Sequence, residues 1–158
     1  MLIKWICMLL TLIVSDVESA KILGVFPYAS KSHSILGQAL FTALAKKGHE
    51  VTYINPFPMN NPPENYRDIP LTDKRLVEVF QAEMDIAFEA NDKSPFFVMN
   101  DWFRDCDLMN EYTLNDPEVQ KLLNSKTENF DLIIIEFLLN EALLGEILFV
   151  FLEIEIIK

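Results

Sequence analysis

The sequence predicts an α/β fold whose core is a Rossmann-like parallel sheet. Residues 22–26 form a short apolar run, which is typical of a strand covered on both faces. A loop at residues 27–32 and a helical pattern at residues 34–48 follow, and residues 51–55 begin a second strand. Strand, helix and strand in this order form a βαβ unit, in which the two strands are parallel. Residues 132–135 are four consecutive aliphatic residues, which again indicate a buried parallel strand.

Apolar residues recur at three- and four-residue steps in the first helix, and they predict its buried face. They are Ile35, Leu36, Ala39, Leu40, Ala43 and Leu44. Ser32 or Ser34 is expected to cap the start of this helix, and Gly48 fits the left-handed position just past its end. His33 therefore lies where the first strand passes into its helix. In open parallel sheets, this edge is where ligands bind.

The sequence of the middle of the chain predicts a loop, followed by a short strand and helices. Residues 56–65 contain four prolines, which exclude a helix or a central strand and predict an exposed loop. Residues 66–71 are a candidate for a short third strand, and Asp73 can cap a helix that runs to residue 88. A further short helix is expected at residues 117–123, opened by Asn115 or Asp116 and by Pro117.

Residues 95–112 are rich in bulky side chains at roughly helical spacing. The simplest interpretation is a helix that faces the core, and the alternative is that part of its face lines an apolar pocket for a lipophilic ligand. Four acidic residues of this stretch predict a solvated face rather than a metal site, because no histidine stands at ligand spacing. They are Asp101, Asp105, Asp107 and Glu111. Cys106 is expected to be a buried free thiol.

The strand at residues 130–135 is the strongest in the chain, and Glu136 follows it directly at its carboxyl end. Another helix is expected to start within residues 138–145. Residues 146–158 show neither a helical stripe nor turn residues, and we interpret them as a divergent hydrophobic tail. The apolar run at residues 149–152 is expected to lack a burial partner.

Residues 1–19 have the pattern of a secretory signal peptide. Lys4 supplies the positive charge, residues 5–14 the apolar core, and residues 17–19 a cleavage site with small side chains. Ten apolar residues are too few to span a bilayer, so we expect cleavage, entry into the secretory pathway and residence in the endoplasmic reticulum lumen, with no transmembrane span in this chain.

Length and composition exclude several classes of protein. A chain of 158 residues, 51% of them hydrophobic, is large enough for one folded domain. The formal net charge of −11 argues against a nucleic-acid partner, because contacts to phosphates need clustered lysine and arginine. The four glycines do not form a glycine-rich phosphate loop.

Two segments resemble the amino-terminal domain of the UDP-glycosyltransferases, in particular their insect members. They are KILGVFPYASKSHSILGQALFTALAKKGHEVTYINP, at residues 21–56, and NFDLIIIEFLLNEALLG, at residues 129–145. The resemblance implies part of a glycosyltransferase-B architecture, in which two Rossmann-like domains face each other across a cleft. Residues 1–19 would then be a signal peptide, residues 20–145 an acceptor-binding domain, and residues 146–158 the divergent end of a truncated chain.

The resemblance also implies a pair of catalytic side chains. Glycosyl transfer to a hydroxyl needs a base for the acceptor proton, and imidazole suits this role near neutral pH. His33 matches the family's base, and Glu136 stands where the family has an aspartate that orients it; Asn140 or Glu141 are alternatives. Such folds have the strand order 3-2-1-4, so His33 and Glu136 would project into one crevice. His49, at a helix–strand turn, is expected to be structural.

The implied activity is transfer of a hexosyl group from a UDP-sugar to the hydroxyl of a small lipophilic acceptor, a reaction of detoxification. The UDP-sugar is a co-substrate, and neither a cofactor nor a metal is expected. We expect the chain to be inactive alone, because its main donor site would lie in a domain that is absent, and to associate with full-length, membrane-anchored relatives. Two alternatives remain open: a secreted non-enzymatic module that binds small lipophilic ligands, and a non-functional product of an incomplete gene model.

Overall fold

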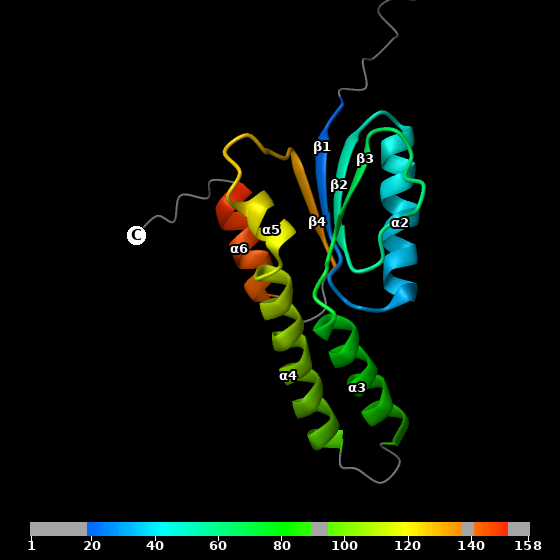
Figure 1. Ribbon diagram of the computed structural model, residues 1–158, viewed down its shortest axis with the longest axis vertical. Helices are drawn as coiled ribbons and strands as arrows, with labels where there is room; N and C mark the ends of the chain where they lie inside the picture. The colour runs from blue at the N-terminus through cyan, green and yellow to red at the C-terminus, as the bar shows by residue number, and fades with distance from the viewer. Residues whose placement is uncertain (1–18, 90–94, 137–140, 152–158) are drawn as a thin grey trace, which may run out of the picture.

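The computed structural model of the chain describes residues 19–89, 95–136 and 141–151. Strands and helices alternate in the first half, and helices dominate the second (Figure 1). In chain order the elements are β1 (Lys21–Val25), α2 (Lys31–Lys46), β2 (Glu50–Asn55), β3 (Tyr66–Pro70), α3 (Arg75–Glu89), α4 (Pro95–Leu114), α5 (Pro117–Leu123), β4 (Leu132–Ile135) and α6 (Glu141–Phe151).

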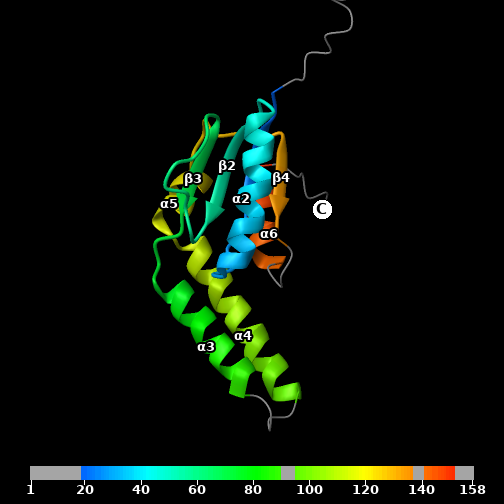
Figure 2. The same cartoon turned by 90° about the vertical axis from the view of Figure 1, so that its right-hand side faces the viewer.

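The four strands form one parallel sheet in the order β3-β2-β1-β4, which confirms the predicted fold class and strand order. Helix α2 covers one face of the sheet, and α5 and α6 lie on the other (Figures 1 and 2). Helices α3 and α4 pack side by side as a long hairpin that extends beyond the carboxyl ends of the strands. The molecule thus has three layers at the sheet and a helical arm below it.

The hydrophobic core is divided by the sheet into two clusters. On the α2 face, Phe41 and Tyr53 lie with their ring centroids 4.6 Å apart, and both are fully buried. The other face holds the larger cluster, in which Leu23 and Val25 of β1 meet Leu76 of α3 and residues of α4, α5 and α6. Alternate residues of each strand therefore enter opposite clusters, as a sheet covered on both faces requires.

Strand β4 is less buried than its sequence predicts. Residues 132–135 were expected to be covered on both faces, yet Leu132 is 47% exposed and the rest of the strand is half-buried. The physical reason is its position, because β4 pairs with β1 alone among the described strands and forms an edge of the sheet. The strand also begins at Leu132, two residues later than expected.

Helix α2 begins earlier than predicted and buries a different face. Its first residue is Lys31 and its N-cap is Ser30, rather than Ser32 or Ser34. The buried residues are Ser34, Gly37, Phe41 and Ala45. Small side chains here let the helix approach the sheet closely, since a Cβ on Gly37 would lie 2.0 Å from the hydroxyl of Tyr53. Phe41 fills the remaining space above Gly24, where an added Cβ would lie 2.2 Å from its ring.

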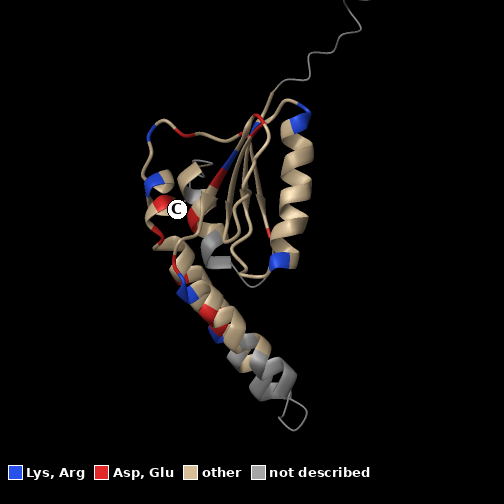
Figure 3. Cartoon of the chain, turned by 45° about the vertical axis from the view of Figure 1, so that its right-hand side comes forward, with Lys and Arg blue, Asp and Glu red and all other residues tan. Residues whose placement is uncertain are grey.

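The side chains predicted to be the buried face of α2 instead point largely to solvent. Ile35, Leu36 and Leu40 are 62%, 69% and 43% exposed, and the prediction for them is wrong. Lysines occupy both ends of the helix, while the stretch between Lys31 and Lys46 carries no lysine, arginine or acidic residue (Figure 3). The outer surface of α2 is therefore an uncharged apolar stripe between two cationic ends.

The predicted helix starts in the middle of the chain are largely confirmed. A carboxylate oxygen of Asp73 accepts a hydrogen bond from the backbone N–H of Arg75, the first residue of α3. The Arg75 guanidinium also donates to that carboxyl and lowers its pKa. Asp116 caps α5 through the N–H of Glu118, 3.0 Å away, and Pro117 occupies the first turn as expected.

The predicted helix at residues 95–112 is confirmed as α4, and its burial corrects one expectation. Asp105 belonged to the face predicted to be solvated, but it is 5% exposed and forms an ion pair with Arg104. Cys106 is buried as a free thiol, as predicted. Met99 and Phe103 are about half exposed, so this part of α4 presents apolar side chains at the surface of the arm.

Helix α6 crosses the expected boundary between residues 145 and 146. It runs from Glu141 to Phe151, and Ile147 is completely buried in the larger core cluster. The ring of Phe151 contacts that of Phe130 edge-on, with centroids 5.0 Å apart. The expectation that residues after 145 lack helical structure is therefore wrong as far as Phe151, and so is the expectation that Phe151 lacks a burial partner. Residues 152–158 lie outside the described part.

No helix in the described ranges is long and apolar enough to cross a membrane. The signal peptide predicted at residues 1–19 lies outside those ranges, except for its last residue.

Candidate functional site

The carboxyl ends of β1 and β4 bring two distant parts of the chain together. Residues Ile22 to Val25 pair in register with Leu132 to Ile135. The pairing continues one step further, because the backbone N–H of Glu136 donates to the carbonyl of Val25 over 3.0 Å. Glu136 is thereby fixed by the sheet itself, directly beyond the end of β4.

His33 is delivered to the same place by the start of α2. The chain leaves β1, turns through residues 26–30 and begins α2 at Lys31, so His33 lies in the first helical turn. The N–H of Ser34 donates to the carbonyl of Ser30, which closes that turn. The sequence placed His33 between strand and helix, and the structure places it two residues inside the helix.

His33 and Glu136 are in direct contact although 103 residues separate them. Nδ1 of the imidazole and Oε1 of the carboxylate are joined by a hydrogen bond. The His33 side chain is 35% exposed, whereas that of Glu136 is 12% exposed. The carboxylate is thus largely shielded from solvent, whereas about a third of the imidazole side chain is open to it.

This contact determines which nitrogen of His33 can act as a base. A carboxylate accepts hydrogen bonds, so Nδ1 carries the proton that Oε1 of Glu136 accepts. The unprotonated nitrogen of the neutral ring is then Nε2, which is the atom that could accept a proton. A carboxylate in this position would also stabilise an imidazolium formed by proton transfer to Nε2. It offsets the partial positive charge of the helix start, which opposes a cation there.

Two aromatic residues near His33, one of which contacts its ring, were not singled out in the sequence analysis. The ring of Tyr28 lies 4.8 Å from the imidazole, centroid to centroid, at an angle of 50°. Phe80 of α3 contacts Tyr28 edge-on at 5.3 Å. An aromatic residue five positions before the histidine was the available signal in the sequence, whereas the contribution of α3 depends on tertiary packing.

Tyr53 lies beneath α2 on the same face of the sheet and is fully buried. Burial raises the pKa of its phenol, and the negative charges of Glu136 and then Asp68 raise it further. The phenol therefore stays protonated at neutral pH and adds no second negative charge near Glu136.

The other predicted candidates do not join this pair. Asn140 lies outside the described residues, and Glu141 is the first residue of α6. His49 lies near the amino ends of the strands, where its Nδ1 accepts the N–H of Ala20 over 3.2 Å, in the structural role expected for it. Among the described residues, no group of three potential metal ligands occurs.

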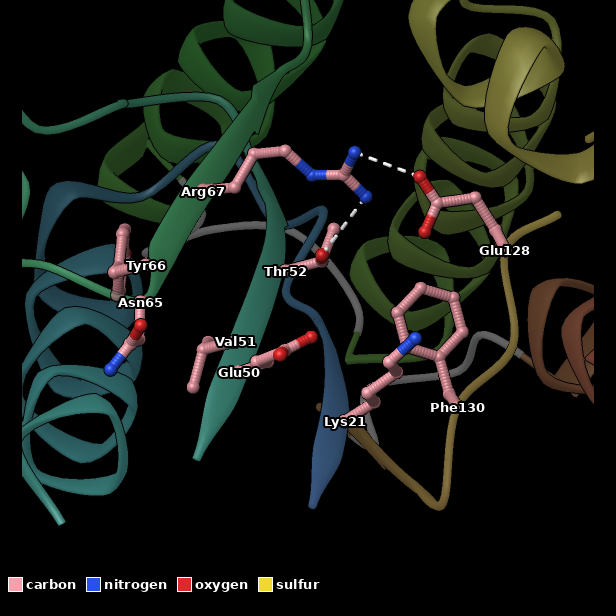
Figure 4. Close-up of a pocket in the computed structure, with 9 residues that line it drawn as sticks. All are labelled: Lys21, Glu50, Val51, Thr52, Asn65, Tyr66, Arg67, Glu128 and Phe130. Carbon is pink, nitrogen blue, oxygen red and sulfur yellow. Dashed lines mark hydrogen bonds and ion pairs between the residues drawn. The ribbon is translucent and has the colours of Figure 1, made fainter. Parts of the chain in front are cut away.

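A hollow of about 410 Å³ lies at the amino ends of the strands, away from His33 and Glu136 (Figure 4). The first residues of β1, β2 and β3 line it together with residues before β4. Its most prominent cation, Arg67, is held by Glu128 at 2.8 Å and by the hydroxyl of Thr52 at 3.0 Å. The hollow contains neither His33 nor Glu136, and its arginine is already paired with Glu128.

Comparisons with known proteins place the chain among homologous enzymes. It is 31% identical over 139 residues to UDP-glycosyltransferase UGT5 of Dactylopius coccus, an alignment that covers 85% of this chain and 26% of the relative. It is also 31% identical over 133 residues to UDP-glucosyltransferase 2 of the same organism, covering 80% of this chain and 24% of the relative. No family model and no solved structure matches the chain.

The chain therefore spans about a quarter of the length of the curated relatives it matches. Its parallel sheet, with the order expected of an amino-terminal Rossmann-like domain, agrees with those matches. We conclude that the chain belongs to the UDP-glycosyltransferase family, with insect-like sequence character.

Proposed function

We propose that this chain supplies part of the acceptor-binding domain and the catalytic base for glycosyl transfer from a UDP-sugar to the hydroxyl of a small lipophilic acceptor. The observation that carries the proposal is the contact between Nδ1 of His33 and Oε1 of Glu136 at the carboxyl edge of the sheet. It joins a partly exposed imidazole to a nearly buried carboxylate, the arrangement that a general base and its orienting partner require.

In the proposed reaction, Nε2 of His33 accepts the proton of the acceptor hydroxyl. The acceptor oxygen forms a bond to the anomeric carbon of the sugar as the bond from that carbon to the diphosphate oxygen breaks. UDP leaves with the electron pair of the broken bond. Glu136 stabilises the imidazolium until the proton passes to solvent or to the leaving diphosphate.

The UDP-sugar is proposed to bind mainly to those regions of the family's proteins that this chain does not span. Support comes from the length comparison, since the chain covers about a quarter of each relative. The UDP-sugar is a co-substrate, and the proposed mechanism uses neither a cofactor nor a metal ion. The 158-residue chain alone is accordingly expected to show no turnover.

The roles can be tested in a family-length chimera, in which residues 20–151 of this chain replace the matching segment of the Dactylopius UDP-glycosyltransferase UGT5. Glu136→Gln should lower kcat on the order of 10²-fold, because the amide neither fixes the tautomer nor stabilises the imidazolium. The measurement is UDP release with a panel of lipophilic alcohols and phenols.

Glu136→Asp is the matched variant, because it keeps the charge and shortens the side chain by one methylene. It should retain more activity than Glu136→Gln. Equal activity of the glutamine variant and the parent chimera would contradict the role proposed for Glu136.

We further propose that the protein enters the endoplasmic reticulum, supported by the charge of Lys4 and the apolar run at residues 5–14. Expression in insect cells should yield a mature chain that begins near residue 20, which amino-terminal sequencing would detect. Replacing two residues of the apolar run with arginine should abolish cleavage. A secreted or luminal chain that still begins at Met1 would refute this proposal.

A further inference from the structure

The imidazole of His33 is held from two sides by residues of different elements. Glu136 contacts one atom of the ring, Nδ1, from the end of β4. The side chain of Tyr28 contacts the ring itself from the loop between β1 and α2, with centroids 4.8 Å apart. One hydrogen bond to Nδ1 still allows the imidazole to change its orientation. A second contact, made with the face or edge of the ring, restricts that rotation.

Tyr28 is itself fixed by its surroundings. Its carbonyl accepts the N–H of Ser30 over 2.8 Å, which closes a tight turn directly before α2. Its ring packs against the larger core cluster and meets Phe80 of α3 edge-on at 5.3 Å. The side chain that restrains His33 is therefore anchored to the loop by its backbone and to α3 by its ring.

The rings of Tyr28 and His33 lie with their centroids 4.8 Å apart, at an angle of 50°. Van der Waals packing at this distance restricts the rotamer of the smaller ring. The contact is thus suited to orienting the imidazole.

We propose that Tyr28 is a positioning residue, which holds the ring of His33 so that Nδ1 meets Glu136 and Nε2 faces the acceptor. This inference rests on the function proposed above for His33 and Glu136. According to this proposal, the catalytic orientation of the His33 ring depends on Tyr28 as well as on Glu136. It also depends on α3, because Phe80 of that helix contacts Tyr28. A base misplaced by about 1 Å can lose on the order of 10²-fold in rate, so the restraint is expected to be visible in kcat.

The first test uses the 158-residue chain and needs no turnover. Long-range ¹H–¹⁵N NMR at alkaline pH, where the imidazole is neutral, reports which ring nitrogen carries the proton. The chain has two histidines, and a His33→Gln spectrum assigns the signals. In the parent protein, Nδ1 of His33 should be the protonated nitrogen.

Tyr28→Leu should shift His33 toward the tautomer mixture of a free side chain, while Tyr28→Phe, which keeps the ring, should preserve the parent spectrum. Tyr112→Leu is the matched control, because Tyr112 packs against the same core cluster and its ring contacts Arg75 instead. An unchanged His33 spectrum in Tyr28→Leu would overturn the proposal, as would an equal change in Tyr112→Leu.

If Tyr28→Leu does not fold, Phe80→Leu decides the question, because it removes the support behind Tyr28 and leaves the loop intact. A partial shift of the tautomer would support the proposal, and an unchanged spectrum would overturn it.

The second test separates this inference from the proposed function. In the chimera, Tyr28→Leu should lower kcat about tenfold to a hundredfold with little change in the KM for the UDP-sugar, and Tyr28→Phe should restore it. Full activity of Tyr28→Leu alongside an inactive His33→Ala would overturn the positioning role alone. Full activity of His33→Ala would overturn the proposed function, while the NMR result would still report whether Tyr28 orients the ring.

Discussion

Replacing His33 with alanine in the family-length chimera is expected to lower kcat by about 10²- to 10⁴-fold, the usual contribution of a general base. The loss should fall on the transition state, because Nε2 gains its proton only as the acceptor oxygen attacks. Binding of the acceptor should therefore change little. Steady-state kinetics give kcat, and quenching of intrinsic tryptophan fluorescence by the acceptor gives its affinity.

His49→Ala is the matched control for this experiment. It also removes an imidazole, but that ring binds the backbone of Ala20 near the other end of the sheet. Its turnover should equal that of the parent chimera once differences in folded fraction are corrected. Full turnover of His33→Ala would show that the histidine is only a residue of the first turn of α2 and not the base. A loss of the same size in His49→Ala would show that the fold, rather than the base, had been affected.

The adjacency of His33 and Glu136 could be predicted from the sequence because it depends on topology. Two βα units in a parallel sheet place the ends of their strands at one edge, and the observed order puts β1 beside β4. The extra methylene of Glu136, relative to an aspartate, does not prevent its contact with Nδ1. What this contact contributes to catalysis stays a prediction.

The buried face of α2 could not be predicted from hydrophobicity. Ser34, Gly37 and Ala45 are buried against the sheet, and at Gly37 a larger side chain would collide with Tyr53. A search for large apolar residues at helical spacing selects the opposite side of such a helix. Phe41 is the one large side chain among the buried residues of α2, and Leu44 packs against the same cluster while partly buried.

Only one of the two contacts of His33 described above, that with Glu136, could be predicted from the sequence. Glu136 follows a recognisable strand, so its location was determined by the strand order. Tyr28 lies in an irregular loop, and its partner Phe80 lies on a helix whose orientation no local pattern specifies. Contacts between a loop and a distant helix depend on packing of the whole domain.

Helix α6 shows how a segment without clear periodicity can still be part of a core. Residues 146–151 are almost uniformly apolar, so no stripe distinguishes an inner from an outer side. The structure makes the distinction, because Ile147 is completely buried while its neighbour Glu146 is exposed. The end of α6 also contacts Phe130 through Phe151, which ties the helix to the segment that leads into β4.

Ile147→Ala is therefore expected to reduce the free energy of unfolding of the 158-residue chain by about 2–5 kcal/mol, the cost of removing a large aliphatic side chain from a packed core. Ile35→Ala makes the same chemical change on the outer face of α2, where the side chain is 62% exposed. It should change the free energy of unfolding by no more than about 0.5 kcal/mol. Urea denaturation followed by circular dichroism measures both, provided the slopes of the two transitions agree with that of the parent. Equal stability of the two variants would mean that α6 is not packed in solution, and the hydrophobic end of the chain would then be a tail after all.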